Sequence, residues 1–209
     1  MIMINKNKWE YFQERLESTW NFYLEFLEKI DQESSKIHKA ISDSNNKQDR
    51  KQYIEYLNEV DIRYRFTLYS SMLITFCSLA EHFVTEITKE IVPKYESEIK
   101  KERGDWLTKN LELIKKVKKN LDIDANDIRL FSCYIKIRNC IVHNRGVISN
   151  SKNRKKLEIA INEIVQYGKQ GNYCLLELTK DGHLLLGCDL VGDVVSKSED
   201  VLGKILETV

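Results

Sequence analysis

The amino-acid sequence predicts a mainly α-helical protein that folds as a single domain over residues 1–209. Three observations support this fold class. Apolar residues recur at three- and four-residue steps over long stretches, which is typical of amphipathic helices. The chain has only one proline and eight glycines, so few positions interrupt a helix. Near its end, Asp181-Gly182 separates two short apolar runs, a pattern that indicates a β-hairpin.

Two long helices are expected in the first half of the chain. Over residues 8–41 the apolar side chains follow one face of a helix, and a polar loop occupies residues 42–47. A second helix is expected over about 49–92, because Pro93 prevents its continuation. Its first part is mostly charged, whereas residues 68–84 are apolar on nearly all sides. We therefore expect this later part to be the core helix.

Shorter helices follow, and one of them carries the candidate site. We expect helical stretches at about 94–101 and 106–119. A start signal at residues 122–127 then opens a helix over 128–144. This helix is expected to stop just past its last turn, because Gly146 can take the left-handed conformation that ends helices.

The last third of the chain combines helix with a small β-hairpin. An amphipathic helix is expected through residues 157–165. The hairpin is expected at about 173–187, and a last helix at about 190–206, which Asp189 can cap. The expected fold is thus an antiparallel helical bundle with long N-terminal helices and a C-terminal hairpin before its final helix.

Composition limits the possible function classes. The formal net charge is only +1, so attraction to nucleic acid must come from local patches. Five cysteines without a C-x-x-C pair argue against a zinc site or a secreted disulfide framework, and we expect reduced thiols, no metal and no cofactor. Residues 1–10 lack a signal-peptide pattern, and the most apolar stretch, 72–80, is too short to cross a bilayer. We expect a cytoplasmic protein without membrane contact.

The segment Arg138-Asn139-Cys140-Ile141-Val142-His143 is the candidate active site. In an ideal helix Arg138 and His143 lie about 140° apart around the axis, whereas Asn139 and His143 are stacked neighbours. Arg138 falls beside an apolar stripe, where an unpaired guanidinium would be costly. Glu81 interrupts the apolar run of the core helix, so we expect Glu81 and Arg138 to form an ion pair. A purely structural ion pair, or two charges at the edges of their faces, are the alternatives.

The densest positive charge of the chain surrounds this motif. Between residues 136 and 156 the sequence contains no acid. Such a patch favours RNA binding, although a solvated cationic face is the alternative. The candidate RNA-binding residues are Lys136, Arg145, Lys152, Arg154, Lys155 and Lys156. We interpret a second lysine cluster at 115–119 as a solvated face.

A core helix with an acid in Ser-Leu-Ala-Glu, followed by a helix ending Ile-Arg-Asn-Cys-Ile-Val-His-Asn, resembles the HEPN superfamily and its R-x4-6-H motif. Arg138 and His143 match the two named residues, Asn139 matches the polar residue after the arginine, and Glu81 matches the acid. The resemblance implies metal-independent RNA cleavage by homodimers. It also implies a toxin or anti-phage defence effector with an antitoxin or defence-system partner. Arg145 stands where some of these toxins carry a modified tyrosine, so that form of control is not expected.

The chemistry of RNA cleavage suits these residue types. RNA supplies its own nucleophile, the 2′-hydroxyl, so cleavage needs a base, an acid and a cation for the charged phosphorane. His143 can serve as base or acid, Arg138 can stabilise the phosphorane, and Asn139 can orient the phosphate or the imidazole. Two alternatives remain: a helical RNA- or partner-binding module without turnover, and a helical scaffold with an incidental Arg and His pair.

Overall fold

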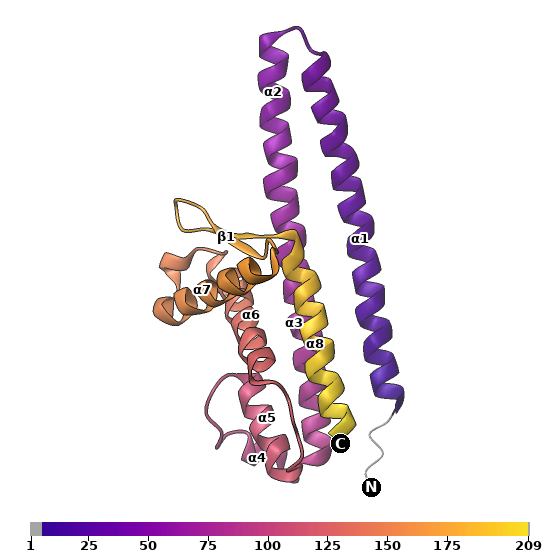
Figure 1. The fold of residues 1–209 in the computed structure, drawn as a ribbon, viewed down its shortest axis with the longest axis vertical. Helices are drawn as coiled ribbons and strands as arrows, with labels where there is room; N and C mark the ends of the chain where they lie inside the picture. The colour runs from indigo at the N-terminus through magenta and orange to yellow at the C-terminus, as the bar shows by residue number, and fades with distance from the viewer. Residues whose placement is uncertain (1–5, 209) are drawn as a thin grey trace.

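Helices account for most of residues 6–208, the part of the chain that the computed structural model describes (Figure 1). Residues 1–5, within the segment where we find no signal-peptide pattern, and residue 209 lie outside this part. The architecture confirms the predicted mainly α fold, with one small antiparallel hairpin before the final helix.

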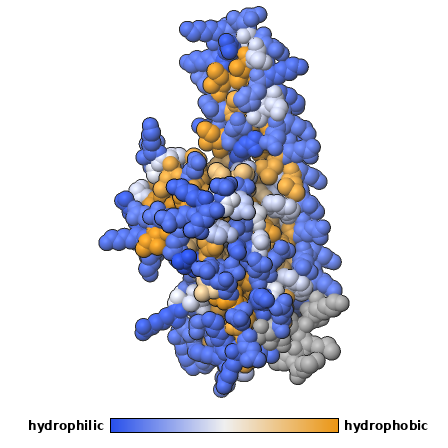
Figure 2. All heavy atoms as spheres, in the orientation of Figure 1, coloured by the Kyte–Doolittle hydropathy of each residue, from blue (hydrophilic) through white to orange (hydrophobic). Residues whose placement is uncertain are grey.

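The first two helices form an antiparallel pair, and the ends joined by their loop project beyond the other helices (Figure 1). They are α1 (Lys6–Asp43) and α2 (Lys47–Asn58). Asn46 caps α2, because its side-chain oxygen accepts a hydrogen bond from the backbone N–H of Gln48 at 2.9 Å. None of the residues of α2 is buried. We call this projecting pair the arm. Figure 2 shows apolar side chains along the arm amid a largely hydrophilic face.

The predicted second long helix is one helical run with an irregular middle. A six-residue π-helical segment, Glu59–Tyr64, joins α2 to α3 (Arg65–Ile91). α3 packs against α1, α5, α6 and α8, and the side chains of Phe76 and Ile87 are fully buried among them. The prediction of a core helix over residues 68–84 is therefore confirmed.

Beyond Pro93 the chain makes one short and one longer helix. Lys94 has a φ of 57°, and only the four residues of α4 (Tyr95–Glu98) follow as helix, so the expected stretch at 94–101 is shorter than predicted. α5 (Trp106–Val117) begins at Asp105, whose carboxylate accepts the backbone N–H of Thr108 at 2.9 Å.

Defined caps fix both ends of α6 (Ala125–Asn144), the helix that carries the motif. At its start Asp124 accepts the backbone N–H of Asn126 at 2.7 Å. At its end Arg145 takes a left-handed φ of 53° and Gly146 follows at 76°. The predicted stop is confirmed, although an arginine rather than the glycine is the first left-handed residue. Two positive φ values in succession turn the chain away from the helix axis.

A helix, a hairpin and a final helix complete the fold. After the 3-10 turn η2 (Ile148–Asn150) come α7 (Arg154–Gly171), β1 (Leu176–Leu178), β2 (Leu184–Leu186) and α8 (Cys188–Thr208). The strands pair in antiparallel register with Leu176 opposite Leu186, and Gly182 takes a φ of 76° in the turn. Asp189, the expected cap, lies in the first turn of α8 and accepts the backbone N–H of Cys174 at 2.8 Å. It thereby ties the base of the hairpin to α8.

Candidate functional site

The two named residues of the motif lie on different faces of α6, as helix geometry predicts. Arg138 faces α3, and its Nη2 donates a hydrogen bond to Oε2 of Glu81 at 2.6 Å. The Arg138 side chain is 16% exposed and that of Glu81 is 39% exposed. His143 is exposed at the end of the helix. The expected pairing of Glu81 with Arg138 is present, whereas any part in catalysis stays a prediction.

Two of the three guanidinium nitrogens of Arg138 have hydrogen-bond partners, and the third is buried without one among the described residues. Nη1 of Arg138 donates to Oδ1 of the neighbouring Asn139 at 3.0 Å. Its Nε is buried and has no hydrogen-bond partner among the described residues. Cys77 lies one helical turn before Glu81 on α3, and burial raises the pKa of its thiol to about 12, although the nearby Arg138 opposes the shift. Arg138 thus points into the contact between α6 and α3.

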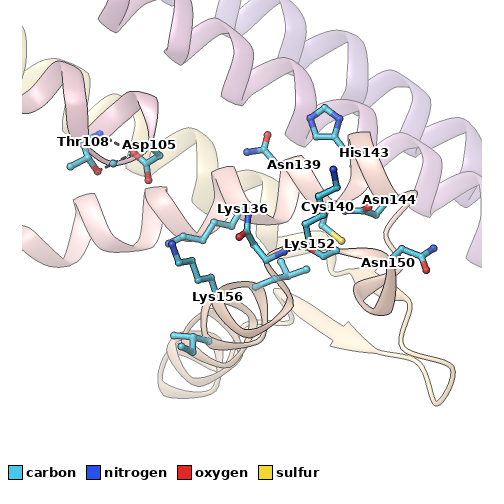
Figure 3. Close-up of a pocket in the computed structure, with 15 residues that line it drawn as sticks. Asp105, Thr108, Lys136, Asn139, Cys140, His143, Asn144, Asn150, Lys152 and Lys156 are labelled. Carbon is cyan, nitrogen blue, oxygen red and sulfur yellow. Dashed lines mark hydrogen bonds between the residues drawn. The ribbon is translucent and has the colours of Figure 1, made fainter. Parts of the chain in front are cut away.

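A cleft of about 1060 Å³ opens beside the other face of α6 (Figure 3). His143 and Asn139 both line it, which agrees with their stacking one turn apart on the helix. Its other walls come from the start of α5, from the loop that leads into α7 and from the first turns of α7. Neither Arg138 nor Glu81 belongs to the residues that line it.

Positive charge gathers in this cleft. Lys136, Lys152 and Lys156 line it, and none of the three forms an ion pair with a residue in the described part of the chain. Figure 3 shows Lys136 and Lys156 extending between α6 and α7. One oxygen of the Asp105 carboxylate, also in the lining, accepts hydrogen bonds from the N–H and the hydroxyl of Thr108, each at 2.9 Å, so three lysines face a single carboxylate in the described lining. The cleft therefore presents unpaired cations that favour an anionic ligand.

The structure brings together half of the predicted RNA-binding residues. Arg154 forms an ion pair with Glu158 at 2.7 Å along α7 and does not line the cleft. Lys155 and Arg145 are exposed and also lie outside the lining. The three lysines of the cleft are accordingly the members of the set that share a surface with His143.

Sequence reasoning missed the amides of the cleft. Asn144, Asn150 and Asn153 line it together with Ser151, although residues 149–152 read only as a polar link in the sequence. Amide and hydroxyl groups donate hydrogen bonds to phosphate oxygens and contact base edges. The repeated asparagines were the available signal, but only the fold places Asn150 and Asn153 of the loop opposite the end of α6, where Asn144 lies.

The cysteine that lines the cleft does not have the features of a reactive thiol. All five cysteines are free; Cys140 lines the cleft but is buried, and burial raises its pKa, which disfavours the nucleophilic thiolate. Within residues 6–208 no cluster of three metal-binding side chains occurs, and none of the helices is long and apolar enough to cross a membrane.

Comparison of the chain with family models, curated proteins and solved structures finds no match. A functional assignment therefore depends on the chemistry of the cleft itself.

Proposed function

We propose that this protein is a metal-independent endoribonuclease that cleaves RNA through attack of its 2′-hydroxyl. One observation carries the proposal: His143 and Asn139 lie in a cleft with three lysines that have no ion-pair partner among the described residues. An imidazole can act as general base or acid, and an amide and ammonium groups can bind the phosphate and stabilise the charged phosphorane without a metal. The resemblance of the motif to the HEPN superfamily supports the same chemistry.

The reaction assigns a task to each group in the cleft. The imidazole of His143 accepts the proton of the 2′-hydroxyl, and the 2′-oxygen then attacks the adjacent phosphorus. The lysines reduce the repulsion of the attacking oxygen and offset the charge of the phosphorane. A proton must reach the departing 5′-oxygen, which leaves a 2′,3′-cyclic phosphate and a 5′-hydroxyl.

The need for a base and an acid supports a homodimer. His143 is the one histidine among the described residues that line the cleft, so a single copy supplies one imidazole. A second copy related by a two-fold axis would bring its own His143 as the acid. Static light scattering tests this step, and a monomer at micromolar concentration would contradict it.

The biological setting follows from the same resemblance. We propose a toxin or an anti-phage defence effector that acts on cytoplasmic RNA and has an antitoxin or defence-system partner. Induced expression tests this proposal: growth arrest that His143→Ala abolishes supports it, and arrest that persists in this variant contradicts it.

A second candidate function is RNA binding without turnover. The observation in its favour is that the ring of His143 is exposed and forms no hydrogen bond with any residue of the described chain, so nothing within one copy fixes its orientation. The lysines would bind the phosphate backbone equally well in a protein that does not cleave it.

Product analysis separates the two functions. Purified protein is incubated with RNA in EDTA, and the ends of any fragments are identified by enzymatic labelling and mass spectrometry. We expect 2′,3′-cyclic phosphate ends from the native chain and none from His143→Ala. His38→Ala, which removes another exposed histidine on α1, is the matched control and should cleave normally. Absence of cleavage by the native chain, or equal cleavage by His143→Ala, would overturn the enzymatic proposal.

A further inference from the structure

The motif arginine does not lie where a substrate phosphate would bind. Arg138 is turned towards α3 and is absent from the cleft lining, whereas its sequence neighbour Asn139 lines the cleft. Yet one guanidinium nitrogen of Arg138 reaches back to the Asn139 side chain. Glu81, Arg138 and Asn139 thus form a continuous chain of contacts from the core helix to the cleft, which we call the relay.

We propose that Arg138 is a positioning residue, which fixes the amide of Asn139 so that its NH2 group donates to a substrate phosphate, while the lysines of the cleft supply the positive charge. This inference rests on the proposed function, from which it takes RNA as the substrate. It assigns Asn139 as the direct phosphate ligand and gives Arg138 an indirect role.

Hydrogen-bond complementarity fixes the direction of the amide. A guanidinium only donates, so the atom of Asn139 facing Nη1 of Arg138 at 3.0 Å must be its oxygen. The NH2 group then lies on the opposite side of the amide, and it has no partner among the described residues. Without Arg138 the amide is free to turn over and present its oxygen, which would repel a phosphate.

Glu81 fixes the guanidinium in turn. The 2.6 Å contact to its carboxylate is a charge-assisted hydrogen bond, and such bonds are among the stronger and more directional ones in proteins. The Nε of Arg138 stays buried without a partner among the described residues, so the pair does not satisfy every donor that it buries. The contact with Glu81 holds the guanidinium in the orientation from which its Nη1 reaches Asn139.

The lysines are placed to supply the charge that Arg138 does not. In Figure 3 the Lys152 side chain rises from the loop before α7 towards the part of the cleft where His143 and Asn139 lie. Lys136 and Lys156 line the same cleft. The phosphate site is therefore assigned to His143, Asn139 and these lysines.

A double-mutant cycle tests the relay. Arg138→Gln, Asn139→Ala and the double variant are compared by kcat on RNA and by Kd for a single-stranded 2′-O-methyl oligonucleotide, which has no free 2′-hydroxyl and cannot be cleaved. If Arg138 acts only through Asn139, each single change lowers binding by about tenfold, the size of one lost hydrogen bond to a charged group, and the double variant is no worse. Losses that multiply in the double variant would overturn the proposal.

A second variant avoids any effect of leaving Glu81 unpaired. Asn139→Asp keeps an oxygen for Arg138 to hold but turns a second oxygen towards the phosphate. We expect it to bind the oligonucleotide more weakly than Asn139→Ala, and equal or tighter binding would contradict the assignment. Arg63→Gln, which breaks the exposed contact with Glu59 in the π-helical segment, is the matched arginine control and should leave Kd unchanged.

The design distinguishes failure of the relay from failure of the proposed function. If the native chain binds the oligonucleotide but does not cleave RNA, the enzymatic proposal fails and the binding cycle still tests the relay. If it cleaves RNA and the losses multiply, only the relay fails. If it neither cleaves RNA nor binds the oligonucleotide, both fail.

Discussion

Two of the polar contacts that helix α6 makes with neighbouring helices lie one turn apart, at Tyr134 and Arg138, and they differ in how completely their polar groups are satisfied. The hydroxyl of Tyr134 donates to Asp193 on α8, and the other carboxylate oxygen of Asp193 accepts from Tyr167 at 3.3 Å. Tyr134 is fully buried, and burial beside Asp193 raises its pKa, so its hydroxyl remains a donor. In the contact with Glu81, by contrast, Arg138 keeps an unsatisfied donor.

The difference predicts which of the two contacts serves stability and which serves the proposed site. A satisfied, enclosed contact stabilises the packing of α6, α7 and α8, because every polar group that it buries has a partner. The unsatisfied contact lies beside the cleft and touches a residue that lines it. Substitutions at the first contact should change stability, and those at the cleft should change activity.

The largest effect is expected at the cleft. His143→Ala should lower the rate of RNA cleavage by about 100- to 10,000-fold, the usual contribution of a general acid or base. Because the side chain is exposed, Tm should stay the same. Cleavage assays and thermal melts check both parts. A lower Tm with normal cleavage by the remaining folded protein would place His143 among the structural residues instead.

Removal of the buried Tyr134 ring should have the next largest effect. Tyr134→Ala should lower the free energy of unfolding by about 3–5 kcal/mol, because it leaves a cavity in the core. Urea denaturation followed by circular dichroism measures this change. Tyr11→Ala, at a tyrosine that is 56% exposed, is the control and should change stability by only about 0.5 kcal/mol. Similar values for the two variants would mean that the Tyr134 contact is not stabilising.

Loss of the hydroxyl alone isolates the polar part of that contact. Tyr134→Phe should cost about 1–3 kcal/mol of unfolding free energy, since Asp193 loses a hydrogen-bond donor in a half-buried position. The same denaturation experiment applies, and cleavage by the folded variant should match the native rate. Reduced cleavage with unchanged stability would break the proposed division between the two contacts.

The smallest expected effect concerns a single charge in the cleft. Lys156→Gln should weaken binding of the 2′-O-methyl oligonucleotide and reduce the slope of log K against log salt by about 0.7, the value for one phosphate contact to a single strand. Binding measured at several salt concentrations gives the slope. Lys51→Gln, on the arm, should leave the slope as it is. An unchanged slope in Lys156→Gln would exclude this lysine from the interface.

The long helices were predictable because their signals are local. Apolar periodicity gave the extent of α1 to within two residues at each end, and Pro93 limited α3 for a steric reason that depends on no other part of the fold. The π-helical segment was not predictable, because apolar residues before it, such as Tyr53, Ile54 and Tyr56, are exposed and mark no buried face along which a shift of one residue would show. The left-handed Arg145 was missed because a glycine lies next to it.

The candidate site was predictable only in part. Two charges within apolar runs predicted the contact of Glu81 with Arg138, since burial makes unpaired charges costly. Helix geometry also predicted that Asn139 and His143 would share a face. The sequence did not show which of the cations near the motif would line the cleft, because that depends on how α7 and the loop before it pack against α6. It also gave no sign that Arg138 would contact Asn139.

The π-helical segment between α2 and α3 sets the direction in which the tip of the arm faces. Its hydrogen bonds enclose one residue more than an α-helical turn does, and one residue corresponds to about 100° of rotation around a helix axis. Gain or loss of a single residue at Glu59–Tyr64 would therefore rotate α2 relative to α3 without moving α6 or its cleft. Related sequences of different length in this segment would present different sides of the arm to solvent while leaving the residues of the cleft in place.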